Sequence, residues 1–291
     1  MTISTLTNDK ILRKEFIEKY IFTKMNPELR YMNLFRRTNL QGATTFEYMR
    51  DETSAEDDIQ KGVMSEPLEV SELSKLSKIE ISGIEKKLGD TAQFGYAMEF
   101  SEQKLRENGI VDDILRFYDR AAYGMARKIN MDILNNLKEF ADAEPITLND
   151  GTWDKSEMIT EDLIDMKRAF EIEGYPYRLS DLFLNTDNYY EANKYYKAVD
   201  GAFNPSNIEG LGFHNVMSDI EEGKLIGIDK KVSPLTLYYN KNPKHSTIPS
   251  SFININKVTD DKYPFVTRVE MWAEMGLACK EPKAILLQEG I

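Results

Sequence analysis

The most constraining feature of this chain is a run of helical periodicity much longer than an average helix. Between residues 111 and 141, apolar side chains recur every three or four positions, so they fall on one face of a single helix. At about 1.5 Å per residue, such a helix would be roughly 45 Å long. Its apolar stripe consists of Ile114, Tyr118, Ala121, Met125, Ile129, Ile133, Leu137 and Phe140.

Two other segments alternate apolar and polar residues with a period of two, as half-buried strands do. One covers residues 94–100, and the other runs from 265 to 277 near the carboxyl end. At about 3.3 Å per residue, the second strand also approaches roughly 45–50 Å. A long helix lying along a long strand predicts an α+β fold with the form of a thin plate. Such a plate suits the tiling of identical copies better than catalysis.

The charge balance argues against a protein that grips nucleic acid. The chain has 37 Lys and Arg against 49 Asp and Glu, which gives a net charge of −12. A surface this acidic repels phosphate backbones, so any DNA nearby must have been placed there by another machine. The remaining composition, 41% hydrophobic and 30% charged, is that of an ordinary globular protein and excludes a fibrous or wholly disordered chain.

Cysteine usage and hydropathy indicate a soluble intracellular protein. The one cysteine, Cys279, cannot form an internal disulfide, so folding does not need an oxidising compartment. No stretch approaches the roughly 20 apolar residues that span a bilayer. Residues 1–10 are polar and lack the apolar core of a secretion signal.

A short amphipathic helix is expected ahead of the main fold. Asp9 can cap this helix, and Asn26-Pro27 ends it. A lone amphipathic helix must bury its apolar side, either on its own subunit or on a neighbouring copy. The apolar positions are Leu12, Phe16 and Tyr20, beside Ile17 and Ile21.

The next segment predicts a projecting ribbon. Residues 43–49 form a strand that carries Phe46 and Tyr48, a strongly charged loop follows from Arg50 to Lys61, and extended chain resumes over 76–84. A two-stranded ribbon is only marginally stable in water and needs a surface to lie on. The segment is therefore either a surface loop or an arm that lies across an adjacent copy.

The middle of the chain predicts a separate α+β lobe of short elements with dense turn signals. A helix is expected over residues 160–170, with Thr160 as its cap and Leu163, Ile164, Met166 and Ala169 facing inward. Short strands follow at 224–228 and 235–239, and a last strand at 284–287 comes after Pro282. The lobe also contains eight tyrosines, which suit either packing or an interface.

The sequence contains no pattern typical of a catalytic, metal or cofactor site. His214 and His245 each lack a second ligand three or four residues away, and both are interpreted as structural. Cys279 lies on the apolar face of the last long strand, where it acts as a small buried hydrophobe. The acidic run 51–58 lacks the glycine and the terminal glutamate of a calcium loop and is interpreted as a solvated loop. We expect no cofactor and no metal.

This order of parts resembles the HK97-fold major capsid proteins of tailed double-stranded DNA viruses. In that family an N-terminal arm precedes an extended two-stranded loop, and a peripheral domain with a long spine helix and long strands surrounds an inserted axial domain. Residues 210–218 (GLGFHNVMS) and the ending 281–285 also resemble stretches of that family. The resemblance implies an arm at 1–42, an extended loop at 43–88, a peripheral domain at 89–141 and 257–291 with the spine helix at 111–141, and an axial domain at 142–256.

The resemblance also implies a function. The chain would be a structural subunit and not an enzyme, and it would assemble with other copies into the pentamers and hexamers of an icosahedral shell. That shell encloses double-stranded DNA without sequence-specific binding and involves no membrane. The expected location is the virion, assembled in the host cytoplasm. Implied partners are a separate scaffolding protein and a portal, with decoration proteins as a further option. Contacts between subunits are expected at Leu12, Phe16, Tyr20, Phe46, Tyr48, Arg50, Asp51, Glu52, Lys61 and Leu68.

Two other functions remain open on the sequence. An encapsulin-like compartment shares the fold but encloses a cargo enzyme instead of DNA. An α+β enzyme with a carboxylate-only site would need clustered Asp or Glu in a deep pocket of the middle lobe.

Overall fold

One helix, α5, runs without a break from Ile110 to Glu139 in the computed structural model of this protein. Its 30 residues correspond to about 45 Å, which confirms the predicted long helix. Asp112 and Asp113 in the first turn and Lys138 in the last turn complement the helix dipole. Seven of the eight residues of the predicted apolar stripe are at most 3% exposed: Ile114, Tyr118, Ala121, Met125, Ile129, Ile133 and Leu137. The eighth, Phe140, follows the end of α5 and is half-buried, because the helix ends two residues earlier than predicted.

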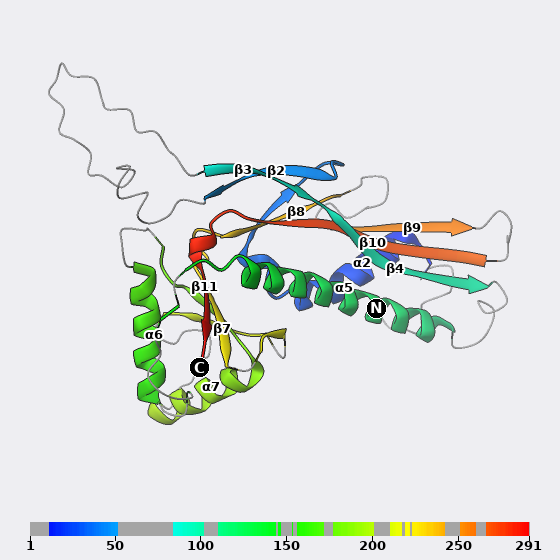
Figure 1. The fold of residues 1–291 in the computed structure, drawn as a ribbon. Helices are drawn as coiled ribbons and strands as arrows, with labels where there is room; N and C mark the ends of the chain where they lie inside the picture. Colours follow the sequence, from blue (N-terminus) through cyan, green and yellow to red (C-terminus); the bar gives the residue numbers. More distant parts are fainter. Residues whose placement is uncertain are drawn as a thin grey trace, which may run out of the picture. The chain divides into compact units, whose positions relative to one another are not determined.

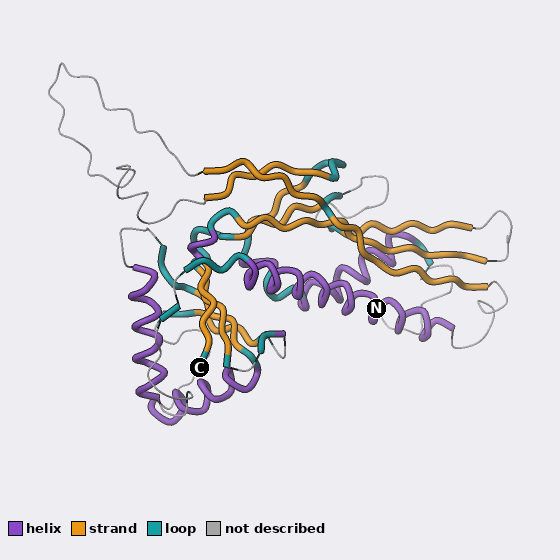
Figure 2. Tube along the Cα trace, viewed as in Figure 1, coloured by secondary structure: helices purple, strands orange, loops and turns teal. Residues whose placement is uncertain are grey.

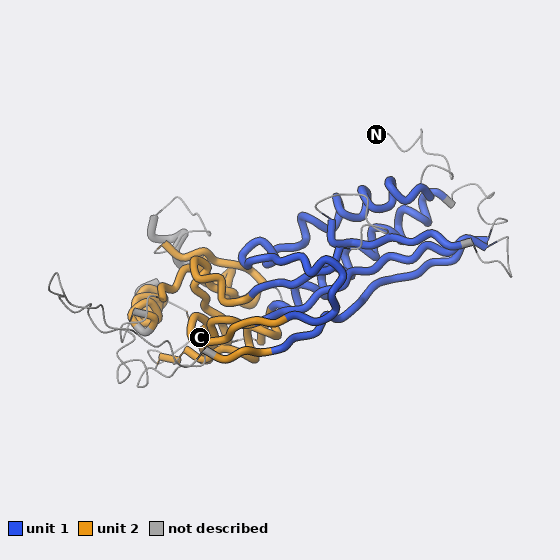
Figure 3. Tube along the Cα trace, turned by 90° about the horizontal axis from the view of Figure 1, so that it is seen from above, with its two compact units in different colours: residues 1–46, 88–133, 236–278 blue, residues 47–87, 134–235, 279–291 orange. Residues whose placement is uncertain are grey.

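The described chain divides into two compact units, shown in Figure 3. Unit 1 contains residues 1–46, 88–133 and 236–278, and unit 2 contains residues 47–87, 134–235 and 279–291. The structure describes residues 12–51, 84–101, 110–143, 145–146, 153, 156–171, 177–200, 210–216, 219–221, 223–241, 251–259 and 266–290.

Unit 1 is built on a five-stranded mixed sheet (Figures 1 and 2). The long central strand β10 pairs antiparallel with β4 over ten residues and with β9 over seven, and β1 pairs parallel with β8. The order along the sheet is β1-β8-β10-β4, with β9 also on β10. The strands are β1 (Arg36–Asn39), β4 (Ala92–Ser101), β8 (Leu235–Tyr239), β9 (Ile253–Thr259) and β10 (Val266–Cys279).

The alternation predicted for the last long strand is present and then shifts near its end. Val269, Met271 and Ala273 are buried on one face of β10, at positions opposite Met98, Tyr96 and Phe94 of β4. α5 runs along the apolar side of β4, since a side chain at Gly124 of α5 would meet the Tyr96 hydroxyl. The sequence predicts Leu277 on the buried face, but Ala278 and Cys279 are the buried residues there, because the alternation breaks at Gly276.

The amino-terminal helix, α2 (Lys14–Met25), packs on unit 1. It lies against β9, and Ile17, Ile21 and Met25 are fully buried. Two short 3-10 turns, η2 (Asn26–Glu28) and η3 (Met32–Leu34), lead from it into β1. The predicted cap, Asp9, lies outside the described residues, and Arg13, which precedes the helix, makes no side-chain capping hydrogen bond.

Unit 2 contains a second, four-stranded sheet with the order β11-β7-β5-β6. β7 pairs antiparallel with both β11 and β5, whereas β5 and β6 are parallel. All four residues of β5 are buried, as expected for a central strand with both faces covered. The strands are β5 (Asp181–Leu184), β6 (Gly212–Asn215), β7 (Lys224–Ile228) and β11 (Ile285–Glu289), with the 3-10 turn η6 (Pro282–Ala284) before β11.

The first helix of unit 2, α6, covers Ser156–Glu171 and corrects two predictions. The predicted cap, Thr160, lies inside the helix, because an additional turn precedes it. That turn brings Ile159 into the core with Leu163 and Met166, so the buried face is defined by these residues. Ile164, predicted to face inward, lies off this face and is 50% exposed.

The second helix of unit 2, α7 (Thr186–Asp200), was missed by the sequence analysis, which predicts only short elements there. Its adjacent tyrosine pairs, 189–190 and 195–196, do not form a clear apolar stripe. The helix forms because β5 and β6 are parallel neighbours, and such a pair needs a crossover connection. In the core, Ala192 of α7 packs with residues of α6 and the sheet.

A separate two-stranded sheet joins β2 (Thr45–Asp51) and β3 (Ile84–Asp90), and we call these two strands the ribbon. The predicted first strand is confirmed. The predicted second strand, 76–84, lies outside the described residues except for Ile84. The described part of that strand, β3, was not predicted, because Glu85, Lys86, Lys87 and Asp90 give it no apolar alternation.

The boundaries of the two units differ from the boundaries of the predicted domains. β8 and β9, largely within the predicted axial range 142–256, belong to the sheet of unit 1. Conversely β11, within the predicted peripheral range 257–291, pairs with β7 in unit 2. Strand pairing between residues far apart in sequence sets this division, and linear order alone does not reveal it. The bounds of the arm, loop, peripheral and axial domains remain predictions.

Candidate functional site

The ribbon carries four of the ten residues predicted to lie between subunits, and its own chain covers some of them. Phe46 is 5% exposed, whereas Tyr48 is half-buried. The guanidinium of Arg50 lies 4.8 Å from the ring centroid of Phe140. The backbone N–H of Asp51 donates to the carbonyl of Lys280 at 2.9 Å. Arg50 and Asp51 therefore hold the end of β2 in place within unit 2, to which both of their partners also belong.

Two exposed apolar residues of the ribbon were not among the predicted contacts. Met49 on β2 is 58% exposed and Leu88 on β3 is 75% exposed. Large apolar side chains this exposed are candidates for an interface. The alternation of Phe46 and Tyr48 already places Met49 on the opposite face of β2, which was the available signal. An exposed ion pair between Lys86 and Glu47 links the two strands and contributes little to stability.

The predicted arm helix docks on its own chain. Leu12 is 4% exposed, whereas Phe16 and Tyr20 are half-buried. The Tyr20 hydroxyl donates to Oδ1 of Asp119 on α5 at 3.1 Å, and Nζ of Lys24 lies 3.3 Å from the same oxygen. Burial, together with the hydrogen bond and charge of Asp119, raises the pKa of Tyr20. Of the two alternatives for the apolar side of this helix, the structure places it on its own subunit.

The remaining predicted contacts, Glu52, Lys61 and Leu68, lie outside the described residues. The assignment of all ten residues to contacts between subunits therefore stays a prediction.

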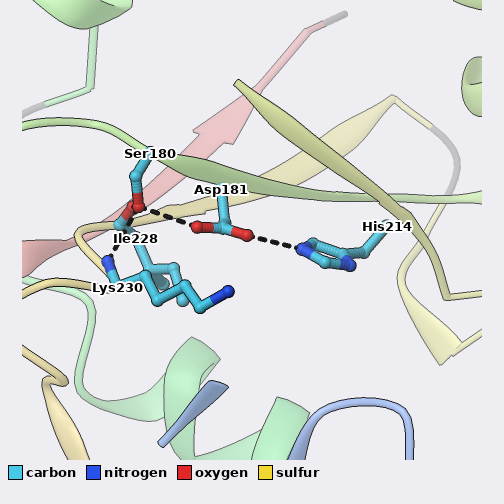
Figure 4. Close-up of polar contacts among 5 residues, drawn as sticks. All are labelled: Ser180, Asp181, His214, Ile228 and Lys230. Atoms are coloured by element: carbon cyan, nitrogen blue, oxygen red, sulfur yellow. Dashed lines mark hydrogen bonds and ion pairs between the residues drawn. The ribbon is translucent and has the colours of Figure 1, made fainter. Parts of the chain in front are cut away.

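A polar cluster in unit 2 joins β5 to β6 (Figure 4). Nε2 of His214 lies 2.7 Å from Oδ1 of Asp181, and the Ser180 hydroxyl donates to Oδ2 of the same carboxylate at 2.8 Å. The backbone N–H of Lys230 donates to the Ser180 hydroxyl at 2.8 Å. Burial alone would raise the pKa of Asp181, but hydrogen bonds from His214 and Ser180, with the charges of His214 and Lys230, outweigh it and lower that pKa.

This cluster contains the residue types of a hydrolase triad, but its geometry differs from one. In a triad, the serine hydroxyl bonds to the histidine and the carboxylate orients the far side of the ring. Here Ser180 and His214 both bond to Asp181, on different oxygens, so the histidine is not placed to accept the serine proton. The His214 ring also stacks on Phe183 with centroids 5.1 Å apart. The arrangement fits a structural role, in which the contact between His214 and Asp181 links β6 to β5. A structural role is also what the sequence predicts for His214.

The described part of the chain provides little else for catalysis or metal binding. No group of three or more His, Cys, Asp or Glu suited to a metal ion occurs among these residues. Cys279 is fully buried, and burial raises the pKa of its thiol to about 12. His245, the other histidine predicted to be structural, lies outside the described residues. None of the helices described is both long and apolar enough to cross a bilayer.

Comparison with known proteins identifies the fold through structure alone. No family model matches the sequence, and no curated protein matches it. Solved structures match over most of their length at low identity. A virus-like particle from Pyrococcus furiosus gives a TM-score of 0.59 at 12% identity, covering 94% of this chain and 98% of that one. The capsid of cyanophage P-SCSP1u gives 0.59 at 8% identity, covering 89% and 86%.

A third structure, the capsid of an empty GTA particle, gives a TM-score of 0.57 at 13% identity and covers 90% of each chain. These similarities extend over both compact units and not over one shared motif. The predicted α+β, HK97-like fold is thereby confirmed.

Proposed function

We propose that this chain is a major capsid protein that assembles with copies of itself into the pentamers and hexamers of an icosahedral shell. The observation that carries the proposal is the extent of the structural match, because 86–98% of each of the three shell chains is covered. The same matches cover 89–94% of this chain, so they extend over both compact units. The proposed role is structural and not enzymatic.

Features of the ribbon support this role. A shell needs interfaces that recur between identical copies, and each must bury on the order of 1,000 Å² or more. Met49 and Leu88 offer exposed apolar surface for such a contact. We propose the ribbon and the arm as the contacting elements. Leu12 and Phe46 are buried in their own chain, so the contacts are proposed at the other predicted residues: Phe16, Tyr20, Tyr48, Arg50, Asp51, Glu52, Lys61 and Leu68.

The content of the shell is proposed to be double-stranded DNA, held without sequence-specific binding. The net charge of −12 supports packaging by a separate motor, since an acidic wall does not trap an incoming strand. Scaffolding, portal and decoration proteins are the corresponding proposed partners, and the virion is the proposed location.

A shell that encloses a protein cargo is the second candidate. The observation that favours it is the match to the Pyrococcus furiosus virus-like particle, which covers 98% of that chain, because the fold then also occurs in a shell that is not described as a phage capsid. The two candidates share every feature of the subunit described above and differ in what the shell contains.

Expression of the full chain, alone and with its neighbouring genes, tests the proposal. We expect rings or closed shells by electron microscopy and a sedimentation coefficient far above that of a 33.6 kDa monomer. Particles purified after nuclease treatment are then opened and analysed for nucleic acid and protein. Protected DNA supports the viral capsid, and a co-purifying protein at fixed stoichiometry supports the compartment. A chain that stays monomeric at high concentration under every condition would overturn both.

A further inference from the structure

The ring of Phe46 fills a closely fitted socket at the root of the ribbon. It stacks on Tyr238 with ring centroids 4.0 Å apart and planes 11° apart. A Cβ atom added at Gly89 would lie 2.5 Å from the ring, and one added at Gly276 would also lie 2.5 Å from it. We call these four residues the Phe46 socket. All four belong to unit 1.

The socket joins four strands that are distant in sequence. Phe46 comes from β2, Gly89 from β3, Tyr238 from β8 and Gly276 from β10. Neither glycine has a positive φ, so the backbone itself would accept another residue at both positions. Glycine in the interior of a strand weakens it and often marks the close approach of another group. Here that group is the Phe46 ring, and the two glycines provide the space it occupies.

A set of hydrogen bonds surrounds the socket and ties the ends of both ribbon strands to β10. Oε1 of Glu274 accepts from the Thr91 hydroxyl at 2.6 Å, directly after β3. Oε2 of Glu274 accepts from Nδ2 of Asn240 at 3.4 Å, and the same amide group donates to the carbonyl of Ala43 at 3.2 Å. The Thr91 N–H donates to the carbonyl of Thr44 at 2.9 Å, which closes the ribbon at its root.

We propose that Phe46 is a positioning residue that seats both strands of the ribbon on β8 and β10 in the free subunit. A two-stranded sheet is marginally stable by itself, so its order depends on what holds it. If the ribbon is already held in place before a second copy binds, association loses less conformational entropy, and this favours binding. The seating is a property of the single chain. Its consequence for assembly rests on the proposed function.

The socket permits a test by exchange of side-chain volume. In Gly89→Ala, the three atoms nearest to the new methyl group all belong to the Phe46 ring, so the ring must leave its place. Phe46→Leu removes the ring atoms that conflict but keeps an apolar side chain in the socket. In the double variant G89A/F46L, the Leu side chain and the new methyl group together refill the socket, so the ribbon should again be seated. Gly276→Ala provides the matched control, because its methyl group would also lie 2.8 Å from the backbone carbonyl oxygen of Asp90. Phe46→Leu cannot relieve that contact, so G276A/F46L should stay defective.

Hydrogen exchange of the full-length, unassembled chain reports the seating directly. In Gly89→Ala we expect peptides from β2 and from residues 84–91 to exchange about tenfold faster, with β9 unchanged. In G89A/F46L the rates should return to within about threefold of the wild type. Val216→Ala, in the core of unit 2, serves as a variant that lowers the melting temperature without touching the socket. Its ribbon should exchange as in the wild type.

Assembly of the same variants is measured by electron microscopy. Gly89→Ala should lose most of its shells and G89A/F46L should regain them. Unchanged ribbon exchange in Gly89→Ala, or a double variant no better than Gly89→Ala, would overturn the seating. If the exchange results hold but the wild-type chain forms no shell, the seating stands and the proposed function fails.

Discussion

Nε2 of His214 and Oδ1 of Asp181 lie 2.7 Å apart and link the parallel strands β6 and β5. Gly212, which lies opposite Asp181 in the register and two residues before His214 on β6, leaves the space for this contact, because a Cβ there would lie 2.7 Å from the same Asp181 oxygen. The pair is therefore built into the core of unit 2, and the Asp181 side chain is only 8% exposed.

Asp181→Asn should destabilise unit 2 by roughly 1.5–3 kcal/mol at pH 7, because a buried charge-assisted hydrogen bond is lost. The pKa of Asp181 in the folded state is lowered from its ordinary 3.8. Its contribution is thus fully present above pH 3.8 and is lost as the pH falls through the lower folded-state pKa. Urea unfolding at pH 7, 5, 4 and 3 should show the difference between wild type and variant narrowing only below about pH 4.

A control for this effect is Asp132→Asn, which removes a carboxylate in an exposed pair with Lys128. We expect it to change stability by less than about 0.5 kcal/mol at any of these pH values. An equal loss in the two variants would contradict the role assigned to Asp181.

Cys279 should be almost inert towards alkylation in the folded protein. Only the thiolate reacts, and burial raises the pKa of this thiol to about 12. Iodoacetamide at pH 8 should label the native chain at least about 100-fold more slowly than the chain in guanidinium chloride. Mass spectrometry of timed samples measures both rates. Labelling of the native chain at the rate of a free thiol would show that β10 opens at its end.

Tyr20→Phe should loosen the arm helix without affecting the rest of unit 1. It removes the hydroxyl that donates to Asp119 on α5, and a loss of about 1 kcal/mol is expected. Lys24→Met, which removes the neighbouring half-exposed ion pair, should lose no more than about 0.5 kcal/mol. Thermal unfolding ranks the two variants, and the reverse order would show that the charge of Lys24, and not the tyrosine hydroxyl, holds the helix.

Ile114→Ala should test the core beneath α5. The side chain is fully buried, and its truncation leaves a cavity that costs roughly 2–5 kcal/mol. Tyr123→Ala on the same helix removes a larger side chain that is 52% exposed and should cost under about 1 kcal/mol. Chemical unfolding measured by tryptophan fluorescence compares them.

Leu88→Glu should separate assembly from folding. Since Leu88 is 75% exposed in the single chain, the substitution should change its stability by less than about 0.5 kcal/mol. If the ribbon lies on a second copy, as proposed, the buried charge should abolish most assembly. Glu85→Gln on the same strand is the matched control. Shells formed by Leu88→Glu at the wild-type yield would exclude Leu88 from the interface.

Local periodicity was sufficient for the longest elements. α5 was predicted at 111–141 and lies at 110–139, and β10 was predicted at 265–277 and lies at 266–279. Each of these elements buries a regular stripe over many residues, so the pattern appears in the sequence itself. Elements whose order depends on distant partners gave no such pattern. β3 consists largely of charged residues, and α7 forms because two parallel strands need a crossover.

The sequence by itself determined the helix and strand that dominate unit 1 and the acidic charge. It also carried the resemblance that predicted the HK97-like fold. Only the tertiary structure decided which strands pair, that the arm helix lies on its own subunit, and that Gly89 and Gly276 surround Phe46. The physical reason is the separation along the sequence. Periodicity shows which neighbouring residues share one face of a helix or strand, whereas the Phe46 socket joins residues up to 230 positions apart, from 46 to 276, which come together only in the folded chain.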